Sequence, residues 1–123
     1  MVNVLIAHDR EEVVDKIKVA LRSLDGDIDK VIVTSDILST RDSLRSSHFD
    51  LMITDLTMPY KEGRDTPSFS NVQTLLEEVF EGGELHVPGD LIGISREAEA
   101  LQLVRTDLGA HFMVTITETN EDG

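Results

Sequence analysis

The stretch of sequence that decides the fold is Asp50-Leu51-Met52-Ile53-Thr54-Asp55-Leu56-Thr57-Met58-Pro59. The run from Leu51 to Thr54 carries no charge, and we expect a strand in the middle of a parallel sheet, covered on both faces. Asp55 ends this strand, and Pro59 turns the chain away from it. Residues at the carboxyl ends of such strands line the crevice in which open α/β sheets bind ligands. Asp55 is therefore the first candidate for a functional residue.

The composition predicts a single globular domain over residues 1–123, with 40% hydrophobic residues. The 24 acidic residues exceed the 11 lysines and arginines, which gives a net charge of −13. This charge argues against nucleic acid as a direct partner and suits divalent cations or a basic protein surface. The absence of cysteine excludes disulfides and thiolate metal sites, and it fits a cytoplasmic location. The apolar residues 2–7 are too few for a signal peptide or a membrane span, so we expect no membrane association.

Strand patterns and helix patterns alternate along the chain. Apolar runs typical of strands occupy residues 4–6, 31–33, 51–54, 91–94 and 112–116. Helical spacing of apolar residues follows the first four runs, at residues 13–24, 36–47, 70–81 and 98–108, and is weakest over 36–47. Ser70 and Gln73 form a predicted capping box for the third helix, and Gly26, Gly82-Gly83 and Gly109 are predicted helix ends. The repeated order predicts an α/β fold, a doubly wound five-stranded parallel sheet with right-handed crossovers.

Polar side chains follow three of the predicted strands at the point where each strand ends. His8 and Asp9 follow the first strand, Asp55 ends the third, and Ser95 ends the fourth. If these strands are neighbours, the side chains converge on one crevice. The structural alternative is that Asp9 caps the first helix, Asp55 starts a turn and Ser95 caps the fourth helix. The coincidence of three polar strand ends favours a functional site.

These segments resemble the receiver domain of bacterial two-component response regulators. The resemblance rests on Val4-Leu5-Ile6-Ala7-His8-Asp9, on the stretch from Leu51 to Pro59, on Leu91-Ile92-Gly93-Ile94-Ser95 and on Gly109-Ala110, and it covers nearly the whole chain. It implies a flavodoxin-like sheet in the order 2-1-3-4-5. It also implies a signalling module and not an enzyme.

The resemblance implies specific roles for five residues. Asp55 would accept a phosphoryl group from a histidine kinase or a phosphotransfer protein. Asp9 and Asp55 would bind Mg²⁺, with the backbone carbonyl of Thr57 completing the protein ligands. Ser95 would be the hydroxyl that bonds the phosphoryl group when the domain switches towards its output domain or partner protein. Thr57 and Glu97 would occupy the positions that tune dephosphorylation.

The site departs from the family pattern at His8 and after the fifth strand. His8 stands where the family has the first acid of a pair, so one negative charge beside the metal is lost. Two unit charges about 4 Å apart exchange roughly 4 kcal/mol at an effective dielectric of 20, so this loss weakens Mg²⁺ binding. Alternatively, His8 together with Asp9 and Asp55 could favour a transition metal. The structural alternative is that His8 is simply an uncharged residue at a strand end. His48, His86 and His111 show no ligand spacing.

The lysine that the family places after the fifth strand is also missing, because residues 112–117 contain none. Lys61 or Arg96 could restore a cation at the site, although both have the character of solvated surface charges.

Two further departures concern a loop and the end of the sequence. Residues 60–69 form a polar loop, longer than the family's, that could be a partner surface, a lid or surface padding. Residues 118–123 are acidic and do not predict the family's fifth helix. The apolar surface such a helix covers must then be covered otherwise, so we expect a fragment or N-terminal domain of a longer protein, or a homodimer through this face.

Three functions remain open from the sequence. The first is a phosphorylated receiver domain, and the second is a phosphorylation-independent pseudo-receiver that serves as an interaction or dimerisation module. The third is a flavodoxin-like enzyme or small-molecule binder. It fits worst, because His8-Asp9-Arg10-Glu11-Glu12 repels an anion and no Gly-rich phosphate loop is present.

Overall fold

The computed structural model describes residues 2–23, 27–107 and 114–117, and its elements follow the alternation expected from the sequence. The strands are β1 (Val2–Ala7), β2 (Ile28–Thr34), β3 (Leu51–Asp55), β4 (Asp90–Ser95) and β5 (Val114–Thr117). The helices are α1 (Glu11–Arg22), α2 (Ile37–Ser46), α3 (Phe69–Glu77) and α4 (Ala98–Asp107), and a short π-helix, η1 (Glu78–Gly82), continues α3. The weakly patterned helix after β2 is confirmed. Gly26 and Gly109, the predicted ends of the first and fourth helices, lie outside the described residues. So do residues 118–123, where no fifth helix was predicted.

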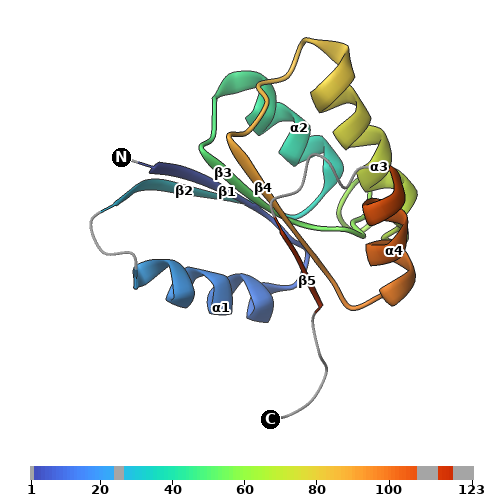
Figure 1. The fold of residues 1–123 in the computed structure, drawn as a ribbon, viewed down its shortest axis with the longest axis horizontal. Coiled ribbons are helices and arrows are strands. Elements are labelled where there is room, and N and C mark those ends of the chain that lie inside the picture. Colours follow the sequence, from blue (N-terminus) through green and yellow to red (C-terminus); the bar gives the residue numbers. More distant parts are fainter. Residues whose placement is uncertain (1, 24–26, 108–113, 118–123) are drawn as a thin grey trace.

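The five strands form one parallel sheet in the order β2-β1-β3-β4-β5, which confirms the expected doubly wound fold (Figure 1). Ala7 at the end of β1 is the register partner of Thr54, and Asp55 at the end of β3 is the partner of Ile94. The carboxyl ends of β1, β3 and β4 therefore lie side by side at one edge of the sheet.

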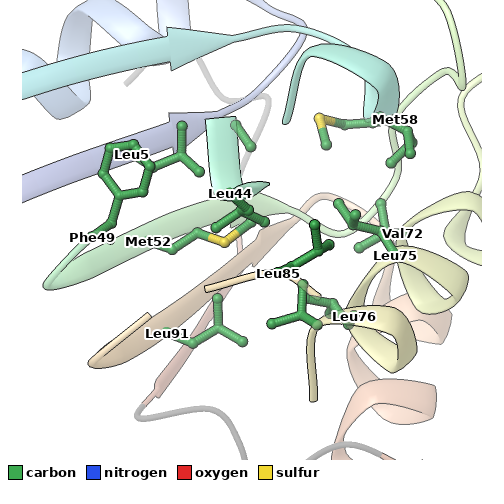
Figure 2. Packing of buried hydrophobic residues seen from close by; sticks show 13 residues of the cluster. Leu5, Leu44, Phe49, Met52, Met58, Val72, Leu75, Leu76, Leu85 and Leu91 are labelled. Carbon is green, nitrogen blue, oxygen red and sulfur yellow. The ribbon is translucent and has the colours of Figure 1, made fainter. Parts of the chain in front are cut away.

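Alternate residues of the strands face the two sides of the sheet, because side chains along a strand point in opposite directions. Val4 and Ile6 of β1 pack in a cluster with Val14 and Leu21 of α1. Leu5 belongs to a second cluster on the other face, which α2 and α3 cover (Figures 1 and 2). Members of this second cluster shown in Figure 2 include Leu44, Met52, Leu76 and Leu91. Both faces of the sheet, and with them the central strand β3, are thus buried, as the apolar sequence of β3 indicated.

The start of the third helix differs from the sequence-based prediction. Ser68, not Ser70, is the N-cap: its backbone is extended and its hydroxyl accepts a hydrogen bond from the Asn71 N–H at 3.3 Å. Ser70 already lies inside α3 and cannot cap it, so the capping box with Gln73 is wrong. The helix continues through η1 and stops at Gly83, whose φ of 78° is left-handed and suits glycine.

The loop between β3 and α3 is held against the start of α2. The first two N–H groups of α2, those of Ile37 and Leu38, donate to the carbonyls of Pro59 and Tyr60 at 3.1 and 3.2 Å. The N-cap residue Asp36 accepts from the Ser39 N–H at 2.8 Å with one oxygen and from the Glu62 N–H at 2.9 Å with the other. The loop therefore satisfies donors that a helix start leaves unpaired. This structural role was not expected from the sequence.

Candidate functional site

A cavity of about 250 Å³ lies at the edge of the sheet where β1, β3 and β4 end. Its lining residues come from the ends of these strands and the loops that follow them: Asp9, Arg10, Asp55, Thr57, Pro67, Arg96 and Glu97. The three strand ends therefore meet at one cavity, but of the expected side chains only Asp9 and Asp55 line it, and His8 and Ser95 do not. Five of these seven residues have charged side chains, so the cavity suits a polar, charged ligand.

Asp55 lines this cavity and is 6% exposed. Its Oδ1 accepts hydrogen bonds from the Thr57 N–H at 3.1 Å and the Thr57 hydroxyl at 3.4 Å. The residue therefore starts a turn, as the structural alternative held, and lines the cavity as well. The bonds from Thr57 fix the direction of the carboxylate.

His8 and Asp9 flank the Asp55 carboxylate. The Nε2 atom of His8 lies 3.6 Å from Oδ2 of Asp55, and Nδ1 of His8 lies 3.8 Å from Oδ1 of Asp9. The His8 side chain is almost wholly buried, whereas Asp9 is partly exposed to the cavity. Asp9 does not cap α1, because the N-cap position is Arg10 and no side chain bonds there.

Burial sets the protonation of the His8–Asp55 pair. Burial raises the pKa of Asp55 to about 6; the charge of His8 and the Thr57 N–H lower it, and the neighbouring Asp9 raises it. Burial also lowers the pKa of His8, against the opposing attraction of Asp55 and Asp9. Burial thus disfavours the charged forms of both partners, the imidazolium of His8 and the carboxylate of Asp55.

The three residues are close enough together to surround a cation. One ligand atom each from His8, Asp9 and Asp55 lie within 4.8 Å of one another, the one such group found among the described residues. The carboxylate oxygens of Asp9 and Asp55 are the hard ligands that Mg²⁺ prefers. The nitrogen of His8 is a ligand for transition metals and not for Mg²⁺. The donor set thus fits a divalent ion, with two carboxylates suited to Mg²⁺.

Ser95 ends β4 with its side chain fully buried. Its hydroxyl oxygen accepts from the Glu97 N–H at 3.0 Å and lies 3.4 Å from the Glu97 carbonyl, to which it donates. The hydroxyl is engaged in this turn before α4 and does not line the cavity, while Glu97 does. The structural alternative, in which Ser95 caps the fourth helix, is thus replaced by a bond to Glu97, the residue before α4.

Two arginines supply the positive charge of the cavity wall. Arg96 lines the cavity, as one of the two alternatives for the missing lysine held, and Arg10 lines it beside Asp9. Lys61, the other alternative, does not line it. Arg10 was not predicted as a site residue, because the sequence analysis treated it only as part of an acidic segment. Its position directly after Asp9 was the signal that could have identified it.

No protein-family model matches the chain. An uncharacterized protein of Sinorhizobium fredii, y4jS, is 29% identical over 107 residues, 87% of this chain but only 26% of that protein. The match therefore spans about a quarter of the length of this curated relative.

Solved structures cover nearly the whole chain. The Mn²⁺-bound form of the response regulator Rcp1 superposes with a TM-score of 0.72 at 17% identity, covering 99% of this chain and 84% of that one. RcsB from Salmonella enterica serovar Typhimurium, bound to promoter DNA with a phosphomimetic, gives a TM-score of 0.69 at 17% identity, covering 99% and 55%. A CheY-like receiver domain from Methylobacillus flagellatus gives 0.63 at 14% identity, covering 98% and 89%.

The chain has the fold of a response regulator receiver domain. In this receiver fold, the order of the strands places Asp55 between the ends of β1 and β4. No helix in the described part of the receiver fold is long and apolar enough to cross a membrane.

Proposed function

We propose that this chain is a receiver domain that accepts a phosphoryl group on Asp55 from a histidine kinase or a phosphotransfer protein. The observation that carries the proposal is the placement of Asp55, which lines a charged cavity at the edge of the sheet with Asp9 and Arg96. An ionised carboxylate in such a cavity is a nucleophile that a phosphoryl donor can reach. In the transfer, a carboxylate oxygen of Asp55 would bond to phosphorus while the bond to the donor nitrogen breaks, and the freed histidine keeps the electron pair.

A divalent ion would support this reaction. Asp9 and Asp55 would hold Mg²⁺, and the backbone carbonyl of Thr57 would complete the protein ligands. When bound, the ion offsets the repulsion between a carboxylate and an anionic phosphoryl group. The Mn²⁺-bound form of Rcp1 shares the fold and is consistent with this assignment.

The arginines of the cavity would take the place of a lysine. Arg10 and Arg96 line the same cavity as Asp55, and a guanidinium can donate two parallel hydrogen bonds to phosphoryl oxygens. Ser95 would have to release the Glu97 backbone before its hydroxyl could bond the phosphoryl group. This exchange would change the start of α4 and the surface that meets an output domain or partner protein. Thr57 and Glu97, both at the cavity, would tune the loss of the phosphoryl group.

We also propose that residues 1–123 work as one domain of a longer cytoplasmic protein or as a homodimer. The curated relative extends well beyond the matched region, since the match covers 26% of it. The chain likewise covers only 55% of RcsB, which binds promoter DNA.

A chemical phosphoryl donor tests the main proposal. Incubation with acetyl phosphate and Mg²⁺ should add the mass of one phosphoryl group to the intact protein, and the Asp55→Asn variant should gain none. Asp90→Asn is the matched control, because Asp90 is an exposed acid at the opposite end of the sheet. An unmodified wild-type protein, or equal modification of the Asp55→Asn variant, would contradict the assignment.

A second candidate is a pseudo-receiver that binds a partner without phosphorylation. The sequence has no lysine after Lys61, and His8 replaces an acid, which favours this reading. It predicts no reaction with acetyl phosphate and partner binding or dimerisation that is equal in wild type and Asp55→Asn.

A further inference from the structure

The hydrogen bonds of the buried His8 ring determine which of its nitrogens carries the proton. Nδ1 of His8 accepts a hydrogen bond from the backbone N–H of Arg10 at 3.1 Å. A nitrogen that accepts has no proton of its own, and a neutral imidazole has one N–H. The proton of neutral His8 is therefore on Nε2.

The nitrogen that carries this proton lies near the carboxylate of Asp55. Nε2 lies 3.6 Å from Oδ2 of Asp55, slightly beyond hydrogen-bond length, and the His8 side chain is only 1% exposed. The other oxygen of the carboxylate, Oδ1, is already bonded by the N–H of Thr57. The two oxygens of Asp55 are thus distinguished: one is held by its own turn, and the other faces His8.

The same arrangement disfavours His8 as a metal ligand. Coordination through Nε2 requires a free lone pair there, which moves the proton to Nδ1. The Arg10 N–H would then lose its acceptor and meet another N–H. Coordination through Nδ1 would likewise displace the Arg10 N–H. Either route gives up a partly buried hydrogen bond of the turn that begins α1.

We propose that His8 is a hydrogen-bond donor in this site and not a metal ligand: its Nε2–H serves Oδ2 of Asp55 and the group that Asp55 carries. A neutral donor in the place of an acid leaves Asp9 and Asp55 as the two carboxylates of the metal site. Unlike Arg10 and Arg96, which line the cavity, this donor lies buried beside Asp55. The role towards a group carried on Asp55 rests on the proposed function, whereas the protonation pattern and the exclusion from the metal do not.

Nuclear magnetic resonance of the imidazole nitrogens tests the protonation pattern directly. Two-bond ¹H–¹⁵N spectra of the full chain should show His8 with a protonated Nε2 and an unprotonated Nδ1, and saturating Mg²⁺ or Zn²⁺ should leave this pattern unchanged. His8→Gln identifies the His8 signals by their loss, and His86→Gln, at an exposed histidine, is the control. A protonated Nδ1, or loss of the Nε2–H on adding either metal, overturns the proposal.

Metal affinity gives an independent measurement. Calorimetric titration with Mg²⁺ should give the same dissociation constant for His8→Gln and wild type, since a glutamine removes the imidazole and keeps an N–H donor. A weakening by about tenfold or more would overturn the proposal, because the loss of even a group that only orients a metal ligand costs about tenfold or more in affinity. His8→Asp should instead bind Mg²⁺ more tightly, because a third carboxylate joins the site.

Beryllofluoride separates this inference from the proposed function. With Mg²⁺ present, its binding at Asp55 should shift the His8 Nε2–H proton and leave the nitrogen pattern intact; binding without that shift overturns the donor role. If beryllofluoride does not bind at all, the proposed function and the donor role towards a carried group fail together. The protonation pattern and the metal affinity still test whether His8 carries its proton on Nε2 and is excluded from the metal.

Discussion

The carboxylate of Asp36 joins the start of α2 to the loop after β3, because it accepts from the Glu62 N–H at 2.9 Å and from the Ser39 N–H at 2.8 Å. Burial of this carboxyl raises the pKa of Asp36, but the bonds from Glu62 and Ser39 outweigh it and hold the pKa below its usual value. One side chain thus caps a helix and anchors a loop that contributes Pro67 to the cavity.

Asp36→Ala should lower the free energy of unfolding by about 1–2 kcal/mol, the usual cost of losing an N-cap. Urea unfolding near pH 7 measures the loss, with the exposed Asp42→Ala on the same helix as control. The folded pKa is lowered, so the contribution is full above the unfolded value of about 3.9 and is lost as pH falls through the folded pKa. Equal stability of Asp36→Ala and wild type near pH 7 would show that the cap contributes nothing.

Asp55→Asn should stabilise the protein at neutral pH. Burial raises the folded pKa of Asp55 from 3.8 to about 6, so the unfolded chain ionises first as pH rises and the folded state loses stability between these values. The asparagine variant lacks this loss, which amounts to at most about 3 kcal/mol. Urea unfolding in a chelator at about pH 5 and about pH 8 should show an advantage that grows with pH. An advantage that shrinks with pH would contradict the assigned ionisation.

Leu44→Ala should be strongly destabilising, because Leu44 of α2 is fully buried between the helix and the sheet (Figure 2). The lost transfer free energy and the cavity left behind together cost about 2–5 kcal/mol. Val19→Ala on α1 is the control, since that side chain is 60% exposed and should change stability by less than about 0.5 kcal/mol. Similar midpoints for both variants in urea would show that the cluster around Leu44 is not packed as described.

Gly89→Ala should be destabilising for a different reason. A Cβ at position 89 would lie 2.8 Å from the backbone carbonyl oxygen of Asp50, and neither backbone can shift without disturbing the pairing of β3 with β4. We expect a loss of about 1–3 kcal/mol. Gly82→Ala is the matched control, because its Cβ would meet only the Glu78 side chain at 3.5 Å. Thermal unfolding of both variants decides the point, and an unchanged melting temperature for Gly89→Ala would contradict the close approach.

The sequence alone determined the succession of strands and helices along the chain and the position of Asp55 at a strand end. These features depend on local periodicity: a buried central strand is apolar throughout, and a helix repeats its apolar residues every three or four positions. The exact start of α3 was not determined, because Ser68 and Ser70 both precede an apolar helical pattern and only the backbone conformation at Ser68 distinguishes them.

Only the tertiary structure decided how the side chains around Asp55 are used. The direction of the His8 ring depends on the backbone N–H of Arg10, and the hydroxyl of Ser95 is engaged by the backbone of Glu97. The placement of Arg10 and Arg96 in one cavity depends on the register of β1, β3 and β4. These relationships join segments that are distant in the chain, or turns whose hydrogen bonds have no sequence period. For that reason, the residue types of the site could be predicted from the sequence, but their contacts could not.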